Sequence, residues 1–219
     1  MTESNQEIVK QLQQVGRYMM DKQLAWGNAG NISARAGKDH CLISASGTYL
    51  GELETDDIVD YTFGDDMSNY QRRPSKEIPM HQAIYEERPD VQAVLHASPF
   101  YSTIVACSDI QLPANLFVED MYYLESVVRI PYFHPGSQEL GDAVRSKARQ
   151  ANILLLENHG VLVFDTSIKE ARMALETLEL VSKMMVSAPS VDFKPLSDAT
   201  VHEFLNDSGY KARRKWEKP

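Results

Sequence analysis

The chain has 219 residues and a formal net charge of −9, with 43% hydrophobic and 24% charged residues. These values are typical of a globular protein with a buried core, and they argue against a nucleic-acid partner, because nucleic-acid-binding proteins present a basic surface to the phosphates. The polar N-terminus does not resemble a secretory signal and no run of about 18 apolar residues is present, so no membrane partner is expected.

The N-terminal part of the chain is predicted to form one helix followed by short strands. Apolar residues recur at helical spacing over residues 5–23, after a capping-box pattern at Ser4 and Glu7. Alternating or β-branched sequence predicts three strands, at residues 31–35, 41–44 and 58–63. The first two are separated by a hairpin-length turn.

Helices and strands alternate through the rest of the chain. Strands are expected at residues 91–97, 127–133, 153–156 and 161–164. Helices are expected at residues 77–88, 100–107, 137–150, from 167 to just before Pro189, and at 197–207. Because several strands are joined by hairpin-length loops and no internal repeat is present, we predict one α/β domain over residues 1–219. Its helices flank a mixed or antiparallel sheet, and a tail begins at about residue 190.

The two cysteines, Cys41 and Cys107, are far apart in the sequence and lack a CxxC spacing. They do not indicate a disulfide framework or a cysteine-based metal site. We therefore expect reduced thiols and a cytoplasmic location.

Four polar side chains from distant segments are candidates for one site. His96 and Ser98 lie two residues apart on an expected strand and so point to the same side of it. His159 follows another strand in a glycine-containing turn, and Glu77 begins a helix. Two imidazoles and a carboxylate with an open fourth position suit a catalytic divalent ion such as zinc. Taken alone, the spacing favours hydrogen-bonded structural histidines, because no short ligand motif such as HxH or HExxH is present.

Three loops of small residues could together bind a phosphate. They are Gly30–Asn31, Ser46–Gly47–Thr48 and Ser75–Lys76. Each offers backbone N–H groups beside hydroxyl, amide or ammonium donors, which is typical of anion-binding loops. Each is also typical of an ordinary turn, and only their convergence in space would distinguish the two interpretations.

Five short motifs occur in a characteristic order along the chain. They are Gly-Asn-Ile-Ser at 30–33, Ser-Gly at 46–47, Pro-Ser-Lys-Glu at 74–77, Ala-Val-Leu-His at 93–96 and Glu-Asn-His-Gly-Val-Leu-Val-Phe at 157–164. This order and spacing resemble the class II aldolase/adducin family over residues 6–188. That family includes fuculose-phosphate aldolase and related phosphosugar epimerases, dehydratases and decarboxylases.

The resemblance implies an αβα sandwich with a central, mainly antiparallel sheet, assembled as a homotetramer with active sites at subunit interfaces. It implies a lyase of the aldolase type that cleaves a phosphorylated ketose through a metal-stabilised enediolate. A decarboxylase or epimerase acting on a phosphorylated sugar acid is the alternative. The cofactor would be a divalent metal, zinc first, with manganese or cobalt as further possibilities.

The resemblance also assigns roles to individual residues. The phosphate would be held by Gly30, Asn31, Ser46, Gly47, Ser75 and Lys76. Glu77 would be the acid/base at the metal, and the ligand positions are those of His96, His159, Glu77 and Ser98. Glu119 and Asp120 are candidates for a second acid/base, and Tyr210 for the aromatic residue that the tail contributes to a neighbouring active site. His81, one turn after Glu77, is expected to be a structural support.

Two positions depart from the family pattern. Ser98 stands where the family has the second histidine of a His-x-His motif, so the third ligand would be Glu77, a water on Ser98, or His134. Lys76 replaces the serine common in the aldolases and is closer to the decarboxylase-like branch. Two further interpretations stay open: a Schiff-base enzyme that uses Lys76, and a non-catalytic, adducin-like oligomeric protein.

Overall fold

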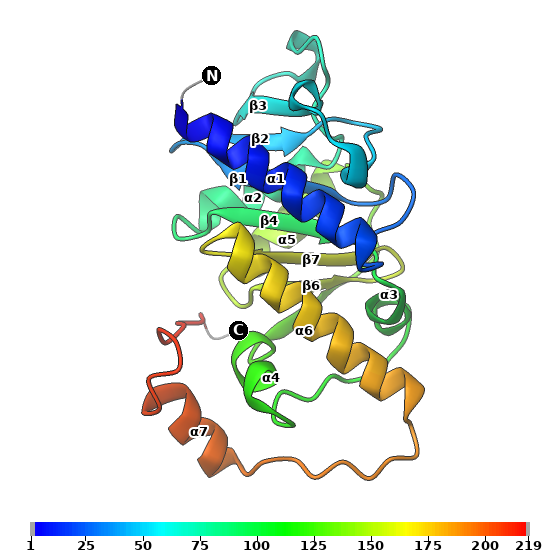
Figure 1. Ribbon diagram of the computed structural model, residues 1–219, viewed down its shortest axis with the longest axis vertical. Coiled ribbons are helices and arrows are strands. Elements are labelled where there is room, and N and C mark those ends of the chain that lie inside the picture. The colour runs from blue at the N-terminus through cyan, green and yellow to red at the C-terminus, as the bar shows by residue number, and fades with distance from the viewer. Residues whose placement is uncertain (1–2, 218–219) are drawn as a thin grey trace.

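The computed structural model describes residues 3–217 and contains a seven-stranded sheet between two layers of helices (Figure 1). The strand order is β3-β2-β1-β4-β7-β6-β5, and every neighbouring pair is antiparallel except β5 and β6, which are parallel. The strands are β1 (Asn31–Arg35), β2 (His40–Ser44), β3 (Ile58–Thr62), β4 (Ala93–Ala97), β5 (Val127–Ile130), β6 (Ile153–Leu156) and β7 (Gly160–Asp165). This confirms the predicted αβα sandwich with a mainly antiparallel sheet.

Helices cover both faces of the sheet and bury a separate apolar cluster on each. One face carries α1 (Glu3–Asp21), α3 (Phe100–Ala106), α4 (Val118–Tyr123) and α6 (Ile168–Ser187). The other face carries α2 (Ile78–Glu87) and α5 (Gln138–Lys147), which lie behind the sheet in Figure 1. The helical spacing of apolar residues in α1 and α6 places one face of each helix against the sheet. None of the helices within residues 3–217 has the length and apolarity needed to cross a bilayer.

Three details differ from the sequence-based prediction. Ser4 already lies inside α1, so it does not cap that helix. Strand β5 ends at Ile130, because Pro131 follows and has no N–H to donate to a neighbouring strand. Helix α4 was not predicted.

Short 3-10 helices at η1 (Leu50–Glu52), η2 (Thr55–Asp57) and η3 (Met67–Asn69) connect the strands of the N-terminal part.

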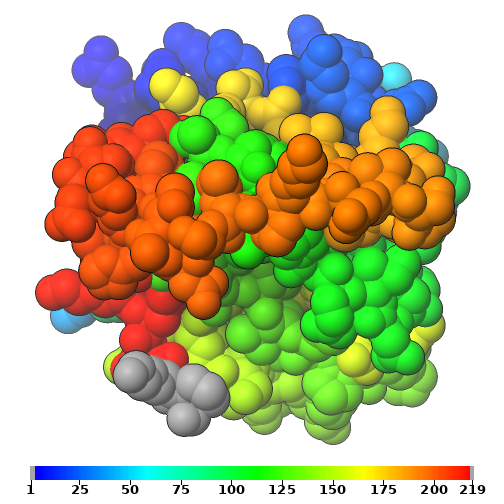
Figure 2. Space-filling view, turned by 90° about the horizontal axis from the view of Figure 1, so that it is seen from below, coloured from blue at the N-terminus to red at the C-terminus, as the bar shows by residue number. Residues whose placement is uncertain are grey.

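The C-terminal segment runs back over the body of the protein. Figure 2 shows the segment between α6 and α7 (Asp198–Asn206) crossing the molecule in orange over the green part of the chain. There the Leu196 N–H donates to the Asn115 carbonyl at 2.7 Å. After α7, ion pairs hold Lys211 to Glu170 and Arg214 to Asp165. These contacts hold the C-terminal segment against the body of its own chain.

Candidate active site

The candidate metal ligands come from three different elements of the fold. His96 lies in β4, where the register places it beside Asn31 of β1. His159 lies in the turn between β6 and β7, next to Asn158, whose positive φ of 54° is a conformation that asparagine tolerates. Glu77 directly precedes the first turn of α2. The central strands and α2 therefore bring together residues that are far apart in the sequence.

The Glu77 carboxylate lies between the two imidazoles. Glu77 Oε2 is 3.3 Å from His96 Nε2, and Glu77 Oε1 is 3.3 Å from His159 Nε2. The Nδ1–H of His96 donates to the Val161 carbonyl at 3.0 Å, so the lone pair of a neutral His96 lies on Nε2 and faces the carboxylate. Lone pairs on oxygen and nitrogen that face each other repel unless a cation lies between them. The arrangement thus fits a bound metal ion, or a proton in its place.

Two further observations support a metal ion in this position. One potential ligand atom from each of Glu77, His96 and His159 lies within 4.8 Å of the others. Glu77 Oε1 is buried and has no hydrogen-bond partner within residues 3–217, which is costly for a carboxylate oxygen. Two imidazoles and one carboxylate form a ligand set found in catalytic zinc sites, and a metal ion would satisfy the orphaned oxygen.

Burial and neighbouring charges act in opposite directions on the titratable groups of the site. Burial disfavours ionised Glu77, but the imidazoles of His96 and His159 and the Asn31 amide outweigh it and lower the pKa of Glu77 to about 2. Burial lowers the pKa of His96, although the Glu77 carboxylate opposes that shift. A carboxylate and a neutral imidazole are the forms that bind metal ions, so both shifts favour metal binding.

A cavity of about 480 Å³ joins the candidate metal ligands to the three small-residue loops. It is lined by all six residues predicted to hold a phosphate, which are Gly30, Asn31, Ser46, Gly47, Ser75 and Lys76, and also by Glu77, His96, Ser98 and His159. A bridge between Ala45 and Pro74 brings the second and third loops side by side. The structure therefore shows the convergence that the sequence could not.

Two residues of this cavity, Gly30 and Lys76, have features that bear on ligand binding. A Cβ on Gly30 would lie 2.7 Å from the His96 carbonyl oxygen, and its φ of +92° also favours glycine. Lys76 is exposed, and its ammonium has no hydrogen bond or ion pair within the part of the chain that the structure describes. The Lys76 ammonium is therefore a positive charge at the cavity that no acidic side chain of the described residues neutralises.

Comparisons with known proteins identify the family of this chain. Residues 10–186 match the sequence model of the class II aldolase and adducin N-terminal domain. The chain belongs to the class II aldolase and adducin family. The 3-oxo-tetronate 4-phosphate decarboxylase of Haemophilus influenzae is 30% identical over 203 residues, which are 88% of this chain and 93% of that protein.

Other class II aldolase-family proteins are similar over most of the chain. The L-fuculose phosphate aldolase of Methanocaldococcus jannaschii is 27% identical over 175 residues, which are 80% of this chain and 93% of that aldolase. Among solved structures, YgbL from Klebsiella pneumoniae superposes with a TM-score of 0.81 at 27% identity, covering 93% of this chain and 99% of YgbL. Decarboxylases and aldolases thus both occur among the family relatives.

Three residues suggested by the family resemblance lie outside the cavity of their own chain. Asp120 is buried, and its carboxylate accepts the N–H groups of Leu116 and Phe117 at 2.9 Å each, which caps α4. Burial raises the pKa of Asp120. Glu119 lies on the same helix. Tyr210 packs its ring 5.9 Å from that of Tyr122 and 5.1 Å from that of Phe204.

His134 also stays apart from the metal cluster. Its Nδ1 lies 3.3 Å from the Tyr132 hydroxyl, and it is not one of the three grouped ligands. Ser98 does line the cavity, where its hydroxyl is 3.5 Å from the His159 carbonyl oxygen. The described residues therefore offer a cluster of one carboxylate and two imidazoles at this family site, with Ser98 at its border.

Sequence reasoning missed the place of Trp26 in the cavity and the hydrogen bonds of His81. Trp26 lines the cavity and is 64% exposed, and a large aromatic residue beside Gly27 was the only available signal. His81, expected to be a support, is fully buried and bonded to the side chains of Asn31 and Ser33. No spacing rule predicts those contacts, because they cross from a helix to a strand.

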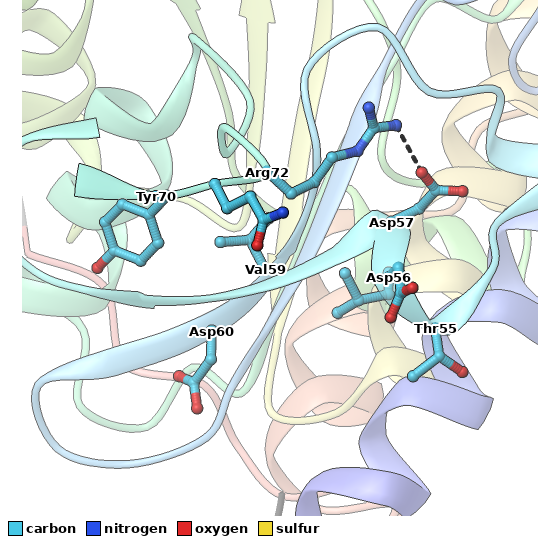
Figure 3. A pocket seen from close by; sticks show the side chains of 9 residues that line it. Thr55, Asp56, Asp57, Val59, Asp60, Tyr70 and Arg72 are labelled. Atoms are coloured by element: carbon cyan, nitrogen blue, oxygen red, sulfur yellow. Dashed lines mark hydrogen bonds and ion pairs between the residues drawn. The ribbon is translucent and has the colours of Figure 1, made fainter. Parts of the chain in front are cut away.

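A second cavity is larger but lacks this chemistry. It occupies about 690 Å³ along the edge strand β3 and is lined by acidic side chains and Tyr70 (Figure 3). Arg72 forms an ion pair with Asp57 there, at 2.6 Å. No histidine or cysteine lines it, so it lacks the two imidazoles of the candidate site.

Proposed function

We propose that this protein is a divalent-metal-dependent lyase that acts on a phosphorylated sugar and cleaves the bond between the carbon beside its carbonyl group and the next carbon. The observation that carries the proposal is the joint cavity, in which the cluster of Glu77, His96 and His159 meets the three small-residue loops. Zinc is the expected ion, with manganese and cobalt as alternatives, because imidazole and carboxylate ligands suit all three.

The ligand residues would hold the ion through His96 Nε2, His159 Nε2 and the Glu77 carboxylate. A divalent ion bound there supplies Lewis-acid stabilisation of negative charge on the substrate oxygens, worth several kcal/mol. The second nitrogen of His96 is fixed by its hydrogen bond to the Val161 carbonyl, so the ring cannot turn its Nε2 away without losing that bond.

The loops and Lys76 would bind and orient the substrate. Backbone N–H groups at Gly30 and Gly47, the hydroxyls of Ser46 and Ser75 and the free Lys76 ammonium are donors that suit a phosphate. Anchoring the phosphate at one end of the cavity places the carbonyl end of a short sugar near Glu77. This positioning reduces the entropy cost of the reaction.

Glu77 would exchange a proton with the substrate. Its low pKa of about 2 suits a carboxylate that is still paired with both imidazoles. A substrate that separated Glu77 from His96 and His159 would leave burial as the main influence, which raises the pKa of a carboxyl group and favours the protonated form. The same side chain could thus accept a proton and later return it.

Two reactions share this chemistry, since aldol cleavage and decarboxylation both leave an electron pair on the carbon beside a carbonyl. Aldol cleavage is favoured by the fuculose-phosphate aldolase relatives. Decarboxylation is favoured by the 30% identical relative and by Lys76, which replaces the serine common in the aldolases of the family.

The test is turnover of a panel of phosphorylated ketoses and 3-oxo sugar acids by the zinc-loaded protein. Aldehyde release and CO₂ release are recorded separately, so the two reactions are distinguished. Chelation should abolish turnover and zinc should restore it, and Glu77→Gln should lower kcat by at least about 100-fold. Turnover that survives full chelation, with a borohydride-trapped adduct on Lys76, would contradict the metal mechanism. Absence of both bound metal and turnover would favour a non-catalytic, adducin-like protein.

A further inference from the structure

A continuous row of buried polar side chains leads from the core to the candidate active site. Its members, each 6% exposed or less, are Tyr85, Ser33, His81, Asn31 and Glu77. From the core outward, the successive donor–acceptor distances are 2.9, 2.7, 2.6 and 2.7 Å. Asn31 and Ser33 lie two residues apart on β1 and point to the face covered by α2. That helix carries His81 and Tyr85, and Glu77 directly precedes it. We call this row the buried relay.

The direction of each hydrogen bond in the buried relay follows from its end at Glu77. An ionised carboxylate only accepts hydrogen bonds, so the Asn31 group at 2.7 Å from Glu77 Oε2 must be the Nδ2 amide. The Asn31 Oδ1 then faces His81 Nε2 at 2.6 Å, so that nitrogen must carry the proton.

The remaining bonds of the buried relay are fixed in the same way. A neutral imidazole has one donor and one acceptor, so His81 Nδ1 accepts from the Ser33 hydroxyl at 2.7 Å. The Ser33 oxygen in turn accepts from the Tyr85 hydroxyl at 2.9 Å. Burial keeps His81 neutral by lowering its pKa to about 3. The opposite tautomer would turn Asn31 Oδ1 toward the Glu77 carboxylate, placing two acceptors against each other.

The geometry points to a positioning role for His81 in the lyase proposed above. We propose that His81 holds the Asn31 amide in the one orientation that donates to Glu77 Oε2, and thereby directs Glu77 Oε1 toward His159 and the metal position. Glu77 directly precedes α2 and lies four residues before His81 of that helix, and Asn31 of β1 forms hydrogen bonds with both. The relay ends at Tyr85 in the core, so it orients Glu77 and does not conduct protons to solvent.

This proposal also concerns the role of Asn31. Its Oδ1 and one of its two Nδ2 hydrogens are already used by His81 and Glu77. Only one side-chain hydrogen is left for a substrate phosphate. Asn31 therefore acts mainly on Glu77, and the other loop residues bind the anion.

The test compares three variants for zinc affinity and turnover. His81→Leu removes both ring nitrogens, whereas His81→Gln keeps an amide that can donate to Asn31. Ile84→Ala, three residues further along α2 and fully buried, is the matched control for lost stability. Zinc affinity is measured by competition with a fluorescent chelator, stability by urea unfolding, and kcat separately from KM.

His81→Leu should bind zinc about 10- to 100-fold more weakly and lose a similar factor in kcat, the usual cost of removing a residue that orients a ligand. His81→Gln should stay within a few-fold of the wild type, and Ile84→Ala should keep its zinc affinity at a comparable loss of stability. Wild-type zinc affinity and kcat in His81→Leu would overturn the proposal and leave a purely structural histidine.

The proposal rests on the proposed lyase function, and one measurement separates their failures. Hydrogen exchange of the Asn31 side-chain amide is followed by NMR in the metal-free protein, because its protection reports the hydrogen bond to Glu77. The protection should fall in His81→Leu and persist in His81→Gln, whether or not the wild type binds zinc or turns over substrate. Unchanged protection in His81→Leu would overturn the positioning role of His81 even in an active enzyme.

Discussion

Ser98 lies immediately after β4, two residues beyond His96, and lines the cavity that contains the metal cluster. Within residues 3–217, its hydroxyl is held only by a contact of 3.5 Å to the His159 carbonyl oxygen, at the long limit of a hydrogen bond. A neutral hydroxyl is a poor ligand for a borderline-soft ion. The cluster therefore offers one carboxylate and two imidazoles, so Glu77 would be one of the three ligands of the substrate-free site.

Replacing Ser98 with histidine should tighten zinc binding by about tenfold or more, because a third imidazole would join the cluster on the side of His96. Competition with a fluorescent chelator measures the change. Ser98→Ala is the matched control and should bind zinc as the wild type does. An unchanged affinity in Ser98→His would mean that this side chain does not face the metal.

Local sequence patterns predicted the long elements better than the short ones. Helix α6 could be predicted because Ser167 caps it, accepting the Glu170 N–H at 3.1 Å, and apolar residues follow at helical spacing. Helix α4 could not, because it has only six residues and is capped by Asp120, a side chain that reaches back from within the helix. A pattern of that length has no measurable period.

The candidate site shows the same division between local and distant information. Short motifs identified Glu77, His96 and His159 as candidates, because each motif is contiguous in the chain. The hydrogen bond between His81 and Asn31 joins residues that are 50 positions apart, and its donor is set by a third residue, Glu77. Such an orientation depends on the packing of α2 against β1 and has no counterpart in the sequence pattern.

The segment after α7 forms ion pairs with other parts of the chain, and these pairs differ in how far they are buried. Arg214 pairs with Asp165 at the end of β7, and the two side chains are 9% and 4% exposed. Arg213 pairs with Glu125 at 2.5 Å, but its side chain is 37% exposed. Screening by water makes exposed pairs weak, whereas a buried carboxylate left without its partner is costly.

Arg214→Ala should therefore lower the free energy of unfolding by about 3–5 kcal/mol, since Asp165 would stay buried and lose its partner. Arg213→Ala is the matched control, one position away, and should cost less than about 1 kcal/mol. Urea unfolding measures both. Equal, small losses would show that the Arg214–Asp165 pair does not fasten the C-terminal segment to the sheet.

At the scale of the whole molecule, the cluster of Glu77, His96 and His159 draws on three separate elements of the fold. Glu77 belongs to the α2 layer, His96 to a central strand, and His159 to the turn between two further strands. An ion held by all three would tie that helical layer to the middle of the sheet. Any ligand that binds the folded state alone raises its stability by mass action.

Zinc at about 100 times its dissociation constant should raise the free energy of unfolding by about 2.7 kcal/mol, and a chelator should reverse the gain. Thermal or urea unfolding with and without zinc measures it. His159→Ala should abolish the zinc-dependent gain because it removes a ligand from one of the three elements. His134→Ala should keep it, since that ring lies beside Tyr132 and outside the cluster. A gain that persists in His159→Ala would place the ion elsewhere, and a gain lost in His134→Ala would make His134 a ligand.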